Sequence, residues 1–224
     1  MHLRGSNALV TGASRGLGAA LARRLAEKGA RVVAVARGAA ELEDVVAGIR
    51  AAGGEAHALP ADVGDKQAIH PLAGAAAALV GPIDLLVHNA STLGRVPLVP
   101  LLDTECEDLE RTLAVNLVGP FRLTKAIAGG MAIRGGGTVV HVTSDAAVSA
   151  YPTWGAYGLS KAAHDHMLRI WAEELPQVRF LSFDPGEMNT RMHADAMPDA
   201  DPATLADPDD VARRLIGVIE GLAP

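Results

Sequence analysis

The chain has only two tyrosines, and one of them, Tyr157, stands four residues before Lys161 in the segment GAYGLSKAAH. The pattern of residues 155–174 predicts a helix, where residues four apart share one face, so the ammonium should lie near the phenol. A neighbouring positive charge favours the phenolate and lowers the phenol pKa from its usual value of about 10. Such a phenol could exchange a proton with a substrate. A half-buried tyrosine packed beside a solvent-reaching lysine would show the same spacing.

Two further polar residues could work with this pair. Ser144 closes the apolar segment GGTVVHVTS (136–144), which is typical of a buried strand. Ligands of open parallel sheets bind at the C-terminal ends of strands, although a serine there could also be a turn or cap residue. Asn116 lies four residues before Pro120, which has no N–H to bond the carbonyl of Asn116. We predict a kinked helix and a free carbonyl that could hold a water; a simple helix break is equally compatible.

The segment TGASRGLG (11–18) lies between the first predicted strand and the first predicted helix. Its glycines allow a tight turn and close approach to a pyrophosphate, and the helix N-terminus adds free N–H groups. An ordinary glycine-rich turn is the alternative, but the position inside a strand–turn–helix unit favours dinucleotide binding. The predicted cofactor residues here are Gly12, Ser14, Arg15, Gly16, Leu17 and Gly18.

The end of the second strand indicates which dinucleotide is bound. An acid there would bind the ribose 2′-hydroxyl of NAD, whereas an arginine favours the 2′-phosphate of NADP. This strand ends in Ala36-Arg37, no acid follows until Glu41, and Arg15 lies in the glycine loop. We therefore predict NADP(H) in preference to NAD(H), unless both arginines only point into solvent.

Apolar strands alternate with helical segments along almost the whole chain, which predicts a doubly wound parallel sheet, Rossmann-like, with helices on both faces. Strands are predicted around residues 7–12, 31–37, 55–63, 81–90, 136–144 and 178–186. Helices are predicted at 17–28, 40–51, 66–80, 104–131, 155–174 and 209–222. No linker or repeat is present, so residues 1–224 should form one domain. The acidic, proline-rich segment 187–208 is predicted to be a substrate lid loop.

Composition argues against several classes of partner. The net charge is −6 and no basic cluster stands out, which disfavours nucleic acid and anionic membranes. No apolar run reaches the roughly 18 residues that a membrane span needs, and no apolar signal segment precedes the first strand. The single cysteine, Cys106, suits a reducing compartment. We therefore expect a cytoplasmic protein with a small-molecule substrate, and we find no spacing of metal ligands.

Taken together, these motifs resemble the short-chain dehydrogenase/reductase family over nearly the whole chain. Seven motifs occur in order at the predicted strand ends. They are TGxxxGxG at 11–18, Asp62-Val63, Asn89-Ala90, Asn116, Ser144, Tyr157-x-x-x-Lys161, and PGEMNT from Pro185 to Thr190.

The resemblance implies a role for each motif. Tyr157 would be the general acid or base, and Lys161 would lower the pKa of Tyr157 and hold the nicotinamide ribose. Ser144 would hydrogen-bond the substrate oxygen, and Asn116 would hold a water that links Lys161 to solvent. Besides Arg37, which the strand end already indicates, the implied cofactor contacts outside the glycine loop are Asp62, Val63, Asn89, Ala90, Tyr157, Lys161, Pro185, Gly186, Met188 and Thr190.

The chain also departs from the family pattern. Family members often read Asn-Asn-Ala-Gly where this chain reads His88-Asn89-Ala90-Ser91. We interpret His88 as a hydrogen-bonded strand-end residue rather than a substrate contact. We expect six strands, without the usual seventh that follows the last helix, and this puts the usual tetramer in doubt. The long helices at 104–131 and 155–174 could instead form a homodimer interface.

The substrate should lie over Tyr157, under loops that carry mostly apolar side chains. The candidate substrate residues are Ser144, Leu93, Val148, Tyr151, Trp154, Met188 and Met192. They suggest a small or medium ketone, aldehyde or secondary alcohol, although Tyr151 and Trp154 could simply cover the start of the helix. The main prediction is an NADP(H)-dependent oxidoreductase. A lyase or isomerase on the same scaffold, or a dinucleotide sensor without catalysis, are the alternatives.

Overall fold

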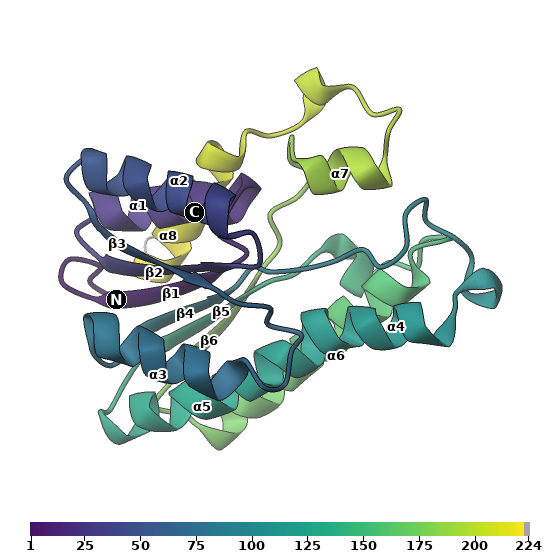
Figure 1. Ribbon diagram of the computed structural model, residues 1–224. Coiled ribbons are helices and arrows are strands. Elements are labelled where there is room, and N and C mark those ends of the chain that lie inside the picture. The colour runs from purple at the N-terminus through teal and green to yellow at the C-terminus, as the bar shows by residue number, and fades with distance from the viewer. Residues whose placement is uncertain (222–224) are drawn as a thin grey trace.

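Six parallel strands form the sheet that positions the site (Figure 1). The computed structural model describes residues 1–221. The strands lie in the order β3-β2-β1-β4-β5-β6, so the direction of winding changes between β1 and β4. Their bounds are β1 Asn7–Thr11, β2 Arg31–Ala36, β3 Glu55–Pro60, β4 Leu85–His88, β5 Thr138–Val142 and β6 Arg179–Phe183. The predicted Rossmann-like, doubly wound sheet of six strands is confirmed.

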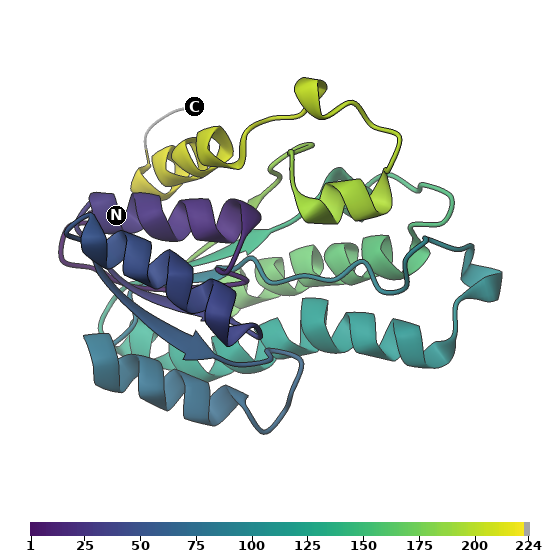
Figure 2. The same cartoon turned by 45° about the horizontal axis from the view of Figure 1, so that its top comes forward.

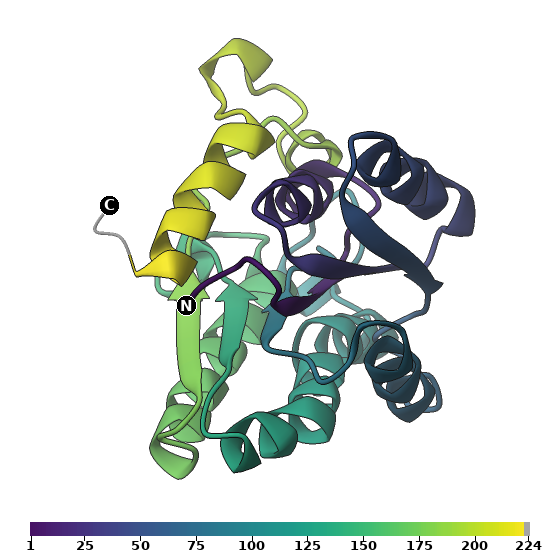
Figure 3. The same cartoon turned by 90° about the vertical axis from the view of Figure 1, so that its left-hand side faces the viewer.

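Helices cover both faces of the sheet, and the end-on view in Figure 3 shows the three layers. One face carries α1 (Gly16–Glu27), α2 (Ala39–Ala51) and α8 (Pro208–Glu220), and the other carries α3 (Ile69–Val80), α5 (Gly119–Ile133) and α6 (Gly155–Glu174). Two helices, α4 (Cys106–Leu113) and α7 (Arg191–Ala196), extend beyond the C-terminal ends of the strands (Figures 1 and 2).

Two apolar clusters hold these layers together, one on each side of the sheet. The central strands β1, β4 and β5 are fully buried, as expected for a parallel sheet covered on both faces. Leucines recurring every four residues along α1, at positions 17, 21 and 25, pack into the first cluster. The chain therefore builds its core from small and aliphatic side chains, with the strand tips left as a rigid edge for a site.

The structure differs from the sequence prediction in two segments. The region predicted as helical at 104–131 is helical from Cys106 to Ile133, but a π-helical turn at Ala114–Val118 interrupts it between α4 and α5. The predicted lid loop contains the short helix α7 and a 3₁₀ turn at Pro202–Thr204, and a β-bridge between Met188 and Ala206 joins its two ends. The last predicted helix ends at Glu220, and position 222 lies outside the described residues.

Candidate active site

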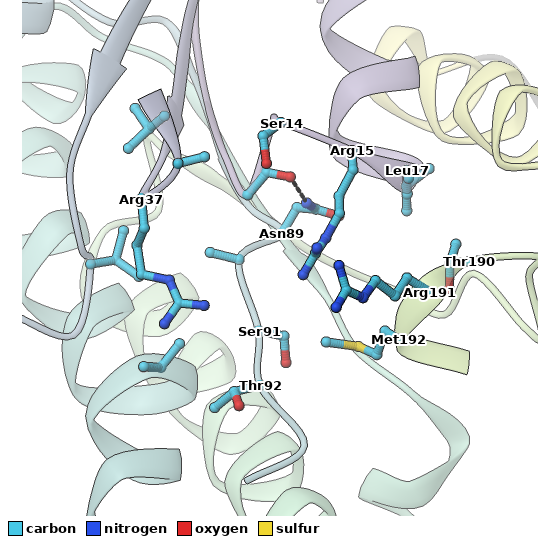
Figure 4. A pocket seen from close by; sticks show the side chains of 18 of the residues that line it. Ser14, Arg15, Leu17, Arg37, Asn89, Ser91, Thr92, Thr190, Arg191 and Met192 are labelled. Carbon is cyan, nitrogen blue, oxygen red and sulfur yellow. Dashed lines mark hydrogen bonds between the residues drawn. The ribbon is translucent and has the colours of Figure 1, made fainter. Parts of the chain in front are cut away.

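A cavity of about 770 Å³ opens along the C-terminal ends of the strands, at the point where the winding changes direction (Figure 4). This size is within the range of small-molecule and cofactor sites. The predicted cofactor residues that line it are Gly12, Ser14, Arg15, Gly16, Leu17, Arg37, Asp62, Val63, Asn89, Ala90, Met188 and Thr190. The other predicted cofactor residues, Gly18, Tyr157, Lys161, Pro185 and Gly186, are not part of this lining.

The glycine loop lies tightly against the end of β4. Gly12 has a φ of +67°, and a Cβ on it would lie 2.8 Å from the Cα of Ala90. Asn89 donates through Nδ2 to the carbonyl oxygens of Thr11 and Gly12, at 3.0 and 3.1 Å. The Thr11 hydroxyl accepts hydrogen bonds from the backbone N–H groups of Asn89 and Ala90. Only glycine fits at position 12, and the cradle it forms is the backbone arrangement that a dinucleotide diphosphate requires.

Asp62 lies at the opposite side of the cavity, after β3. Burial acts to raise the pKa of its carboxyl, but hydrogen bonds from the Arg111 guanidinium and the Gly64 N–H outweigh this effect and hold the pKa below its usual value. The Arg111 nitrogen lies 2.6 Å from the carboxylate oxygen. Asp62 is thus an ionised, fixed acceptor at the edge of the cavity.

Ser144 and Tyr157 meet beside the cavity, at the end of β5 and in the first turn of α6. The Ser144 hydroxyl accepts from the Ala146 N–H at 3.2 Å and donates to the Asp145 carboxylate at 3.0 Å. Tyr157 is 8% exposed, and this burial raises the pKa of its phenol to about 12, although the neighbouring Ser144 hydroxyl acts in the opposite direction. The phenol is therefore protonated at neutral pH and can donate a proton.

Lys161 lies against the Tyr157 ring. Its Nζ atom is 5.5 Å from the ring centroid and donates a hydrogen bond to the carbonyl of Val142 at 2.7 Å. Burial lowers the pKa of Lys161 to about 8. The expected lowering of the Tyr157 pKa by this ammonium is outweighed in this structure, because burial raises the pKa of the phenol.

Asn116 lies in the π-helical turn, where its side chain ties three segments together. Its Nδ2 donates to the Thr92 carbonyl and the Ser160 hydroxyl, and its Oδ1 accepts from the Thr92 N–H. The prediction of a free Asn116 carbonyl was wrong, because His164 Nδ1 donates to this oxygen at 2.9 Å. Pro120 lacks the N–H that would bond the Asn116 carbonyl in a regular helix, and the His164 side chain donates to this carbonyl instead.

Three buried histidines lie behind Lys161. His88 and His141 are paired on β4 and β5, and the His141 ring stacks on His164 with centroids 3.5 Å apart. As interpreted from the sequence, His88 has a hydrogen-bond partner, the Thr124 hydroxyl at 2.8 Å. Burial, reinforced by the Lys161 charge, lowers the pKa of His88 to about 3, and burial likewise lowers those of the other two. The cluster is therefore neutral, and Lys161 carries the only positive charge among these four side chains.

The candidate substrate residues divide into two groups. Leu93 packs with Tyr157 and Ala146, and Trp154 and Met192 pack against this small cluster. Val148 is 91% exposed, and Tyr151 is 45% exposed with its hydroxyl bonded to Asp145. Met188 lines the nucleotide cavity and packs against the core under α8. The first group surrounds the phenol, so those residues are the better-placed candidates.

Sequence reasoning missed several residues that line the cavity. They include Thr92, Arg111, Val115 and Arg191. Arg191 directly follows the PGEMNT motif, so its position alone could have identified it. Arg111 could not be found in this way, because only the fold brings α4 next to Asp62.

Residues 6–201, which carry this entire arrangement, match the family model described as short chain dehydrogenase. The chain belongs to the short-chain dehydrogenase/reductase family. It is 33% identical to 2,3-dihydro-2,3-dihydroxybenzoate dehydrogenase of Bacillus subtilis over 99% of this chain and 91% of the relative. The protein is thus an oxidoreductase of this family that acts on CH–OH groups with a nicotinamide dinucleotide.

Solved structures of this family agree with the fold. A metagenomic short-chain oxidoreductase in complex with NADP has a TM-score of 0.83 and 34% identity, with 97% of this chain and 92% of that chain covered. A 7α-hydroxysteroid dehydrogenase with NADH and 7-oxo glycochenodeoxycholic acid has a TM-score of 0.87 and 29% identity, covering 97% and 89%. Among the curated relatives, the chain covers between 49% and 91% of the relative's own length. In residues 1–221 no helix combines the length and apolarity that crossing a membrane requires.

Proposed function

We propose that this oxidoreductase transfers a hydride between NADP(H) and a small or medium carbonyl compound or secondary alcohol, with Tyr157 as the general acid or base. The observation that supports this most strongly is the grouping of Ser144, Tyr157 and the buried Lys161 beside the cavity. Met192 belongs both to the cavity lining and to the apolar cluster around Tyr157, so the phenol adjoins the proposed nucleotide site.

The residues around the phenol have distinct tasks in this proposal. The Ser144 hydroxyl and the Tyr157 phenol bind the substrate oxygen, and Tyr157 gives its proton to that oxygen during reduction or takes one during oxidation. Lys161 keeps a positive charge next to the phenol, and Asn116 holds the segment after β4 in place. Bound NADP(H) supplies or accepts the hydride at its nicotinamide. A panel of ketones, aldehydes and alcohols followed by NADP(H) absorbance tests this assignment, which fails if no member of the panel changes the absorbance.

The preference for NADP(H) rests on the charges at the end of β2. Arg37 and Arg15 line the cavity, the strand end itself carries no carboxylate, and Glu41 reaches the cavity only from the first turn of α2. Asp62, which also lines the cavity, is bonded to Arg111. A 2′-phosphate would therefore meet positive charge, and a 2′-hydroxyl would lack a carboxylate acceptor at this position.

Substituting Arg37 with glutamine should raise the Kd for NADPH about 10- to 100-fold, since a charge-assisted phosphate contact is lost. The Kd for NADH should change by less than about threefold, because NADH has no 2′-phosphate. Titration of the nucleotide fluorescence measures both constants. Arg31→Gln, at the other end of the same strand, is the matched control. An equal loss for both nucleotides would assign Arg37 to a different part of the cofactor.

We also propose that the chain forms a homodimer through the outer faces of α5 and α6. A groove of about 390 Å³ runs between them, lined by Leu117, Val118, Phe121, Ala163, His166, Met167 and Ile170. Phe121 and Ile170 are 40% and 46% exposed, which leaves large apolar side chains uncovered on this face. A two-fold axis would pack the same face of two copies together.

We also propose a cytoplasmic location, because Cys106 is a free thiol and free thiols suit a reducing compartment.

Light scattering should give twice the mass of one chain, and Phe121→Asp should convert the protein to a monomer. The charge would be buried without a partner in the proposed interface. Ile133→Asp is the control, because Ile133 is 90% exposed and lies outside the groove. A monomeric wild-type protein, or a dimer that survives Phe121→Asp, would rule out this interface.

A further inference from the structure

Two arginines from distant parts of the chain point into the same region of the cavity. Arg15 precedes α1 in the glycine loop, and Arg191 is the first residue of α7. Figure 4 shows their guanidinium groups converging from these two segments. Within residues 1–221, neither guanidinium has a hydrogen bond or an ion pair with a carboxylate.

Arg111, which lines the same cavity, is by contrast paired with Asp62. Arg191 has Asp195 one turn later on α7, a spacing that commonly gives an ion pair, yet no such pair forms. Two guanidinium groups that face each other repel, and an anion between them removes the repulsion. The planar fork of arginine suits phosphate oxygens particularly well.

The backbone places Arg191 against the part of the cavity that suits a diphosphate. The Thr190 methyl lies 3.4 Å from where a Cβ on Gly16 would stand, so the start of α7 touches the glycine loop directly. The N-terminus of α1, which attracts phosphate, begins at this same loop. Arg37 lies across the cavity from Arg191, toward Asp62, whose pKa its charge helps to lower.

We propose that Arg191 binds the diphosphate of the cofactor from the α7 side, opposite the glycine loop, and thereby fixes α7 over the substrate site. The proposal rests on the dinucleotide binding described above. The next residue, Met192, packs in the cluster around Tyr157. Binding of the diphosphate by Arg191 therefore sets the position of a substrate-pocket side chain, so cofactor binding prepares the pocket for substrate.

Nucleotide binding without turnover tests the proposal, using Arg191→Gln with both NADPH and NADH. Since both nucleotides carry the diphosphate, we expect the Kd values to rise by the same factor, about 10-fold or more. Arg191→Lys should recover part of this loss. In the wild-type protein NADPH should protect residues 187–207 from proteolysis, and in Arg191→Gln it should not at equal cofactor occupancy. Arg23→Gln, on the exposed side of α1, controls for the loss of one positive charge.

Each alternative result has a definite meaning. A loss confined to NADPH would overturn the proposal and place Arg191 on the 2′-phosphate. Unchanged Kd values with a raised KM for acidic substrates alone would overturn it in favour of a substrate anion. Wild-type protein that binds neither nucleotide would contradict the proposed function itself, which separates that failure from a failure of Arg191.

Discussion

Replacing Tyr157 with phenylalanine should lower kcat/KM by about 10³- to 10⁴-fold, because the variant lacks the phenol that lies buried beside Ser144 and can donate a proton at neutral pH. The ring remains in place, so the apolar cluster with Leu93 and Met192 should persist. Steady-state kinetics with the best substrate of the panel measures the loss.

The Kd for NADPH should stay within about threefold of the wild-type value, since the phenol is not part of the lining of the nucleotide cavity. Thr138→Val is the matched control, because it removes a buried hydroxyl from the opposite end of β5. Activity of Tyr157→Phe near the wild-type level would exclude Tyr157 as the proton donor.

Replacing Lys161 with methionine should lower kcat/KM by about 10²-fold or more while leaving the protein about as stable at pH 7. The folded state depresses the Lys161 pKa from 10.5 to about 8, so the buried charge costs about 3 kcal/mol at neutral pH. Methionine removes this cost but leaves the Val142 carbonyl without its donor, a loss of about 1–3 kcal/mol. These two effects largely cancel.

The pH dependence of stability separates this account from simple misfolding. The unfolded lysine keeps its proton up to a pH of about 10.4, and the folded one only up to about 8, so this group makes the wild-type protein more stable as pH rises between those values. The variant lacks this gain. In thermal unfolding, the stability of the variant relative to the wild type should therefore be higher at pH 7 than at pH 9. A variant that is much less stable than the wild type at both pH values would contradict the account.

The fold could be read from the sequence because its signals are local. Valine-rich strands, amphipathic helices and the glycine loop can each be recognised from a segment of about ten residues. The alternation of strands and helices then predicts that the strands are parallel. The cavity-lining residues from Gly12 to Asn89 could be predicted for the same reason, since each follows a strand end.

What could not be predicted depends on contacts between distant segments. Nothing near Asn116 shows that its carbonyl accepts a hydrogen bond from His164, because that contact joins two helical segments. The hydrogen bond from Lys161 to the Val142 carbonyl likewise joins α6 to the end of β5, so the sequence near Lys161 does not show it. The Y-x-x-x-K spacing therefore predicts that the two side chains meet, but it does not show how strongly burial acts on the phenol pKa.

The most direct test of the central claim follows the hydride itself. NADPH carrying deuterium at the transferred position of the nicotinamide should be incubated with a reducible ketone or aldehyde from the panel, and the product analysed by mass spectrometry and NMR. The account predicts one deuterium on the carbinol carbon, one NADP⁺ formed per alcohol, and neither product with Tyr157→Phe. Conversion of substrate without deuterium transfer or net oxidation of NADPH would contradict it and would indicate lyase or isomerase chemistry instead.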